Sequence, residues 1–276
     1  MKYMAIGLVL IASSVFANPL DNLNWEYEGI YDVPNQDATI LVMTEQSLVR
    51  GDDAAILEEE INGVPSSPNA VPSSPNAVLL NQDLSRFIIT ESRPGFIKMD
   101  DWEESIDSND LLQELIDSTE DDNKHRKGAL LFIDGWAEKP TLNKKEATMY
   151  YAIRAHSSEN EKIVNARALK LSREGYSQIT WVGSQEQFIS AEDNLAPTLE
   201  QLKYEQGHTY KDFVPETDTV AAFGAGALMY KLITGKVAGK GGLAIGALLL
   251  AFGKKLWFLI FLPVVWLKNK LFKKDK

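Results

Sequence analysis

The sequence contains no cysteine and only three histidines. Without cysteine the chain can form no disulfide, no thiolate metal site and no cysteine nucleophile. The histidines are His125, His156 and His208, and no two of them have the spacing of a helical metal site. A glycine-rich phosphate loop and a GxSxG nucleophile elbow are also missing. We therefore expect no catalytic, cofactor-binding or metal-binding residue, and a protein that is not an enzyme.

Charge is abundant and unevenly distributed. Of the 276 residues, 45% are apolar and 24% are charged, which is enough for one domain with a real core. The ten lysines and one aspartate between Lys231 and Lys276 carry a net charge of +9, and Lys2 adds +1. Because the net charge of the whole chain is −11, the remaining residues carry −21. An acidic body argues against nucleic acid as a partner. A basic, apolar tail instead suits the lipids of an anionic inner-membrane leaflet.

The first seventeen residues have the pattern of a secretory signal peptide. Lys2 is the charged region, Met4 to Ala12 is the apolar region, and Val15 and Ala17 are the small residues before a cleavage point. A buried N-terminal helix or an uncleaved anchor is the alternative, but the apolar run is too short for the ~30 Å of a bilayer core. We expect a mature chain that starts at Asn18, outside the cytoplasm.

Hydrophobic patterning along the body alternates between strands and helices. It predicts two strands around a Pro34-Asn35 turn, a helix capped by Asp52, a hairpin about Arg93 to Gly95, and a helix capped by Ser108 or Asn109. Four strands then follow, at 129–138, 147–155, 162–171 and 176–183, and a helix after Ser184 that breaks near Pro197 and resumes toward Gly207. Short connections favour antiparallel pairing. The fold class is therefore α+β, a mainly antiparallel sheet with packed helices, followed by a C-terminal membrane-anchoring helical region.

A tandem repeat interrupts the body. The seven residues VPSSPNA occur twice in succession, from residue 64 to residue 77. Four prolines and four serines prevent regular pairing, so the segment is expected to be an exposed Pro/Ser-rich loop.

The C-terminal region holds two apolar runs, Thr219 to Gly235 and Leu243 to Leu267. The first would be ~25 Å long as a helix, just enough to cross a bilayer. The second carries Lys254 and Lys255 in its middle, and a lysine at the bilayer centre costs about 2.5–3.5 kcal/mol, which the apolar residues of the run roughly offset. The placement of charge decides, because Lys254, Lys255 and the basic tip can all lie in the cytoplasm if only the first run crosses. We therefore expect one crossing, with the body in the periplasm and the C-terminal tip in the cytoplasm, although the number of passes stays open.

Basic and aromatic residues of the tail are expected to lie at the membrane: Lys254, Lys255, Trp257, Trp266 and Lys268. A GxxxG sequence from Gly242 to Gly246 could also pack tails together into a homo-oligomer.

Five polar residues crowd together just before the first apolar run: Glu205, His208, Tyr210, Asp212 and Asp218. One hypothesis is a proton-responsive or ion-binding collar, because histidine titrates near neutral pH and neighbouring carboxylates favour its charged form. On this hypothesis His208 lies beside Asp212 and Asp218. The alternative is an interfacial connector, in which Tyr210 and Phe213 anchor at the surface and Asp218 caps the next helix.

Two stretches resemble a bacterial family of predicted membrane-anchored proteins known only as a domain of unknown function, number two-one-six-seven. They are GWAEKPTLNKKEATMYYA, Gly135 to Ala152, and YEQGHTYKDFVPETDTVAAFGAGAL, Tyr204 to Leu228. The likeness runs from about Asn24 to the C-terminus, and the doubled VPSSPNA departs from it. The resemblance implies anchoring in the bacterial envelope and carries over no catalytic residue.

These expectations divide the chain into a signal peptide (1–17), an acidic extracytoplasmic α+β domain (18–213), and a membrane anchor with a basic cytoplasmic tip (214–276). The function expected is that of a non-enzymatic interaction or scaffold domain with an envelope protein as partner. The alternative is a domain that binds a small ligand or lipid near the membrane.

Overall fold

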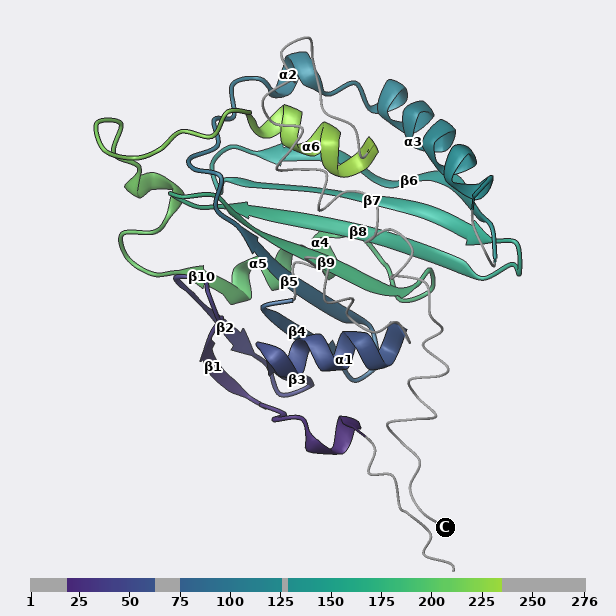
Figure 1. Cartoon of the computed structure of the whole chain (residues 1–276), viewed down its shortest axis with the longest axis horizontal. Helices are drawn as coiled ribbons and strands as arrows, with labels where there is room; N and C mark the ends of the chain where they lie inside the picture. Colours follow the sequence, from purple (N-terminus) through teal and green to yellow (C-terminus); the bar gives the residue numbers. More distant parts are fainter. Residues whose placement is uncertain (1–18, 63–74, 126–128, 235–276) are drawn as a thin grey trace, which may run out of the picture.

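A computed structural model describes residues 19–62, 75–125 and 129–234. Its centre is a seven-stranded antiparallel sheet, and its strand order is β3-β4-β5-β9-β8-β7-β6 (Figure 1). The strands are β3 (Gln46–Arg50), β4 (Ala77–Asn81), β5 (Arg86–Ser92), β6 (Leu131–Asn143), β7 (Thr148–Ser157), β8 (Lys162–Leu171) and β9 (Tyr176–Ser184). The α+β class and the four consecutive strands predicted from the sequence are confirmed.

A second, three-stranded sheet has the order β1-β2-β10. It consists of β1 (Gly29–Asp32), β2 (Ala38–Val42) and β10 (Leu202–Tyr204), all antiparallel. The turn that joins β1 to β2 contains Asn35 with a φ of 61°, a left-handed conformation that asparagine tolerates. The predicted hairpin around Pro34-Asn35 is thus confirmed.

The large sheet buries both of its faces. One face carries Ala77, Phe87, Ile179 and Trp181 and packs against the small sheet and two short helices, α4 (Ala191–Asn194) and α5 (Ala196–Gln201). The other face is covered by α1 (Asp52–Asn62) over β3 and β4. At its far end, the same face is covered by α2 (Trp102–Ser105), α3 (Ser108–Asn123) and α6 (Ala225–Thr234) (Figure 1). Two 3₁₀ turns, η1 (Pro19–Asn22) and η2 (Tyr210–Asp212), complete the described elements.

An ion pair between α1 and β5 is buried beneath the helix. The Arg86 side chain is 2% exposed, and its Nε donates to Glu58 Oε1 at 2.7 Å while Nη2 donates to Oε2 at 3.3 Å. Two parallel hydrogen bonds satisfy both charges away from water. Helix α1 is therefore attached to the sheet by a polar contact as well as by its apolar face.

Helix α6 is part of the body. Ala225, Leu228, Met229 and Ile233 are at most 3% exposed and pack in the same core cluster as Tyr151 of β7. The domain boundary expected at residue 213 therefore does not separate body from anchor. The run Thr219 to Gly235 was expected to cross a membrane, but its residues 225–234 form α6 and pack in this core instead.

The start of α6 is fixed by a distant carboxylate. Asp101 accepts hydrogen bonds from the backbone N–H groups of Gly226 and Ala227, both at 3.0 Å. These N–H groups have no partner inside the helix, so Asp101 serves as their cap. A Cβ atom on Gly226 would lie 2.7 Å from the Asp101 backbone oxygen. Glycine is thus required where α6 approaches α2.

Other sequence expectations are corrected by the strand pairing. Strand β5 pairs with β4 and β9, so the hairpin expected about Arg93 to Gly95 is wrong, and Phe96 instead bridges Val220. Strands β3 and β4 were missed. Helix α3 has Asp107 as its N-cap instead of Ser108 or Asn109. No helix starts directly after Ser184 as expected, because residues 185–187 form a turn. Pro197 lies in the first turn of α5, which begins at Ala196, and does not break a helix. The helix expected to continue toward Gly207 ends at Gln201, and Leu202 to Tyr204 form a strand.

Several expected features lie outside the described residues. They are the signal peptide, most of the Pro/Ser-rich loop, and the tail with Lys254, Lys255, Trp257, Trp266 and Lys268. Within residues 19–62, 75–125 and 129–234, every helix is too short or too polar to reach across a bilayer.

Candidate functional site

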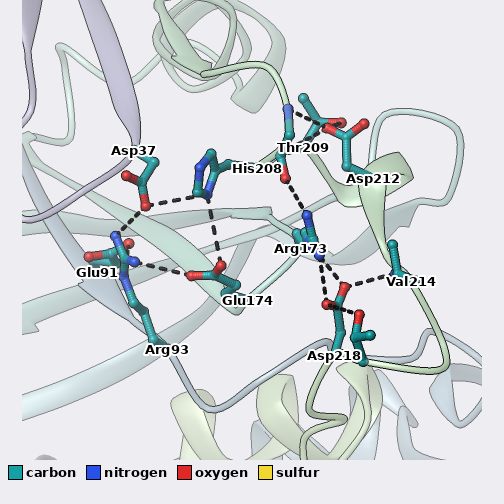
Figure 2. Close-up of polar contacts among 12 residues, drawn as sticks. Asp37, Glu91, Arg93, Arg173, Glu174, His208, Thr209, Asp212, Val214 and Asp218 are labelled. Atoms are coloured by element: carbon teal, nitrogen blue, oxygen red, sulfur yellow. Dashed lines mark hydrogen bonds and ion pairs between the residues drawn. The ribbon is translucent and has the colours of Figure 1, made fainter.

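Polar side chains from four separate segments meet at one end of the two sheets (Figure 2). We call this group the polar junction, and its members are Asp37 before β2, Glu91 and Arg93 at the end of β5, Glu174 in the β8–β9 turn and His208 after β10. The segments are far apart in sequence and are brought together by strand pairing. The junction therefore depends on the whole fold.

Arg93 holds the carboxylates of the junction together. Its Nη2 lies 2.8 Å from Asp37 Oδ2, its Nη1 lies 3.1 Å from Glu174 Oε2, and its Nε lies 2.9 Å from Glu91 Oε1. Nη2 also donates to the Asn35 carbonyl at 3.0 Å. The β1–β2 turn is thereby fastened to the end of the large sheet.

His208 faces the same carboxylates. Its Nδ1 is 3.3 Å from Asp37 Oδ2 and 3.9 Å from Glu174 Oε1. The His208 backbone is held on both sides, because its N–H donates to Glu205 O and its carbonyl accepts from Arg173 N, both at 3.1 Å. The imidazole is thus placed by the backbone of the loop and not only by its own contacts.

The junction carries an excess of negative charge. Three carboxylates face one guanidinium, which leaves two negative charges uncompensated when His208 is neutral. Burial raises the pKa of Glu91, the attraction of Arg93 lowers it, and the charges of Asp37 and Glu174 raise it further. The sum of these effects raises the pKa of Glu91 above its usual value.

The expected collar is divided by the structure. His208 does not lie beside Asp212 or Asp218 as the sequence suggested. Asp212 Oδ2 accepts hydrogen bonds from the Thr209 hydroxyl at 2.6 Å, the Thr209 N–H at 2.9 Å and the Gly207 N–H at 3.1 Å, which hold its pKa below its usual value. This carboxylate stabilises a loop.

The other collar residues also have structural partners. Tyr210 donates to the Ile97 carbonyl at 2.8 Å and stacks on Phe96, and burial raises its pKa to about 12. Phe213 stacks on the same Phe96 ring. Glu205 is exposed and contacts the junction through its backbone, whose N–H donates to Asp37 O at 2.9 Å. The interfacial roles expected for Tyr210 and Phe213 are replaced by packing within the body.

Asp218 forms a bidentate ion pair with Arg173, next to the junction (Figure 2). Both contacts measure 2.7 Å, and Asp218 also accepts from the Val214 N–H at 2.8 Å. Asp218 does not cap α6, as the sequence suggested, because Asp101 occupies that position. The ion pair attaches the segment before α6 to the β8–β9 turn.

Replacing Arg173 by methionine is expected to raise the pKa of Asp218. Hydrogen bonds from Arg173 hold that pKa well below its usual range, and the Val214 N–H lowers it further. A carboxyl pKa lower in the folded than in the unfolded state stabilises the fold above the unfolded pKa, and this stability is lost as pH falls through the folded pKa. The variant should therefore unfold at a higher pH on acid titration.

An NMR titration of the Asp218 carboxyl carbon measures this shift directly. Arg154→Met is the control, because Arg154 contacts the Trp136 carbonyl instead and its loss should leave Asp218 unchanged. An Asp218 pKa that is equal in wild type and Arg173→Met would show that the ion pair does not exist in solution.

A surface hollow lies at the far end of the sheet. It has a volume of about 410 Å³ and is lined by Asp134, Arg154, His156, Asn160, Lys162 and Gln185. His156 Nδ1 is 2.7 Å from Asp134 Oδ1, and its ring stacks on Phe132. All six lining residues have charged or polar side chains.

Exposed apolar side chains gather on the β1–β2 hairpin and the residues next to it. The apolar hairpin patch consists of Tyr27, Ile30, Leu41 and Met43, which are 63%, 70%, 41% and 48% exposed. Ile30 and Leu41 are direct cross-strand partners. Exposed acidic residues lie on this hairpin or next to it, at Glu28, Asp32 and Glu45.

The fold and this site define an acidic α+β protein whose two sheets are joined by a charged cluster. The chain belongs to the family described as "Protein of unknown function (DUF2167)", whose model matches residues 26–265. Among curated proteins, none matches the sequence. A similar solved structure is that of cyanobacterial PsbP (CyanoP) from Synechocystis sp. PCC 6803, with a TM-score of 0.37 and 8% identity over 64% of this chain and 92% of that chain. A likeness this weak carries no functional argument.

Proposed function

We propose that the protein is anchored in the inner membrane of a bacterial envelope and that its acidic domain binds another envelope protein without catalysing a reaction. The signal-like first residues and the basic, apolar tail support export of the domain and retention at the membrane. On this proposal the body, including α6, lies in the periplasm, Leu243 to Leu267 attaches the chain to the membrane, and the C-terminus lies in the cytoplasm.

The observation that carries the proposal is the apolar hairpin patch. Single exposed apolar residues are ordinary, whereas several together on one hairpin are typical of a binding surface. Ile30 is 70% exposed, and its direct cross-strand partner Leu41 is 41% exposed. Covering such side chains is favourable by roughly 25 cal/mol for each Å² of apolar surface removed from water.

Charge indicates which partner suits the patch. Exposed carboxylates flank the apolar side chains, and the body as a whole is strongly acidic. An anionic lipid surface would be repelled, so we propose a protein that presents an apolar surface with basic residues around it.

Ile30→Cys supplies a single reactive thiol, because the chain has no cysteine. In spheroplasts, a membrane-impermeant maleimide crosslinker on this thiol should capture one discrete protein, which mass spectrometry identifies. Lys144→Cys in the β6–β7 turn is the control, since that residue is exposed and lies beside the edge strand β6 of the large sheet, whereas the hairpin belongs to the small sheet, and it should capture none.

Three outcomes would contradict parts of the proposal. Labelling only after the spheroplasts are broken would place the domain inside the cell. A product that contains only two copies of this chain would replace the heterologous partner by self-association. Equal capture from positions 30 and 144 would show that the hairpin is not the binding surface.

A further inference from the structure

Three atoms in the polar junction have the arrangement of a metal-ligand set (Figure 2). They are a nitrogen of His208, a carboxylate oxygen of Asp37 and one of Glu174, and they all lie within 4.8 Å of one another. Zinc binds nitrogen and oxygen ligands at about 2.0–2.2 Å, which places tetrahedral ligand atoms about 3.4 Å apart. The observed separations of 3.3 Å and 3.9 Å from His208 Nδ1 approach this spacing.

The charge of the junction favours a cation. Arg93 compensates one of the three carboxylates, and the remaining two negative charges match a divalent ion. Glu174 uses Oε2 for Arg93 and turns Oε1 toward His208, so it can bind a metal without releasing the guanidinium. Asp37 Oδ2 contacts both Arg93 and His208, and it is the ligand that the ion would have to share or take over.

We propose that His208, Asp37 and Glu174 bind one zinc ion, with water at the remaining position. An imidazole ligand favours zinc over magnesium and calcium, which prefer oxygen ligands only. The three side chains come from the β1–β2 turn, the β8–β9 turn and the loop after β10. The ion would therefore link both sheets to the segment that leads into α6. This inference is independent of the partner proposed for the hairpin.

Isothermal titration calorimetry with zinc chloride tests the site on the full chain, purified in detergent and stripped with a chelator. We expect one zinc per chain with a dissociation constant in the micromolar range or below. Millimolar magnesium should give no binding. Cobalt in place of zinc should give visible absorption bands that report direct coordination by the protein.

Three variants locate the ion. His208→Ala and Glu174→Gln should each weaken zinc binding by at least ~100-fold, because even second-shell changes cost 10–100-fold in metal affinity. Both side chains are partly exposed, at 34% and 47%, so folding should persist and is checked by circular dichroism. His156→Ala is the matched control, since His156 also pairs with one aspartate but has no third ligand among the described residues.

The proposal is overturned by wild-type protein that binds no zinc at 100-fold molar excess. It is also overturned by binding that His208→Ala and Glu174→Gln leave intact. Loss of binding in His156→Ala alone would move the ion to the hollow beside Asp134 and would likewise reject the junction. Retained cobalt bands in His208→Ala would exclude the imidazole as a ligand.

Discussion

Replacing Glu58 by glutamine is expected to lower the free energy of unfolding by about 3–5 kcal/mol, because the change leaves the Arg86 charge buried without a counter-charge. The Arg86 side chain is 2% exposed and that of Glu58 is 11% exposed, so water cannot take over the lost interaction. Glutamine has nearly the shape of glutamate, and the loss will therefore report charge and not a cavity. Urea unfolding of the purified chain, followed by tryptophan fluorescence, measures it.

A more exposed ion pair of the same type provides the control. Glu26 pairs with Arg50, with side chains that are 23% and 27% exposed, and Glu26→Gln should cost no more than about 1 kcal/mol. The double variant Glu58→Leu, Arg86→Met should recover most of the stability, because apolar residues of similar volume replace a buried ion pair well. If Glu58→Gln cost as little as Glu26→Gln, the Arg86 guanidinium would have to be hydrated in solution.

Replacing Gly226 by valine is expected to destabilise the protein by about 1–3 kcal/mol and to release α6 from the body. A Cβ atom at this position would lie 2.7 Å from both the Asp101 backbone oxygen and the Ser105 Cβ, so the helix must move away from α2. Leu228, Met229 and Ile233 would then become exposed. Thermal unfolding measures the loss, and limited proteolysis within residues 213–234 detects the release.

Ala227→Val is the matched control for this prediction. Ala227 lies next along the helix and is half-buried, so the same valine should cost less than about 1 kcal/mol through helix propensity alone. Equal losses at the two positions would mean that the close approach of α6 and α2 is not what stabilises the helix.

Regular local patterns predicted much of the fold. The four strands of residues 131–184 alternate with short polar turns, and the hairpin around Asn35 has clear turn residues, so both could be predicted. Strands β3 and β4 were missed because they are short and flank α1 and the repeat. The partners of an individual strand, such as β9 for β5, depend on long-range packing that local periodicity does not report.

The apolar C-terminal residues show where hydropathy fails. Residues 225–234 are apolar enough to suggest a membrane segment, yet they fill the core under α2 and α3. The two glycines of FGAGAL are explained by their contact with Asp101, a residue more than one hundred positions earlier. A single sequence contains no signal for that pairing.

The candidate site was only partly accessible to sequence reasoning. His208 was singled out by its acidic neighbours in sequence, but its acidic neighbours in space are Asp37 and Glu174. Asp212 and Asp218 instead bond to Thr209 and Arg173. Metal-ligand spacing within one helix could not reveal a ligand set that is assembled from two turns and a loop.

The attachment of α6 determines how the domain responds to mechanical load. The described body ends at Thr234, on a helix whose buried face and Asp101 cap tie it to β7 and α2. A force applied at residue 235 therefore acts first on the packing contacts of α6. Under tension, α6 would separate from the core before the force acted on the large sheet, so this helix is the first element that force would unfold.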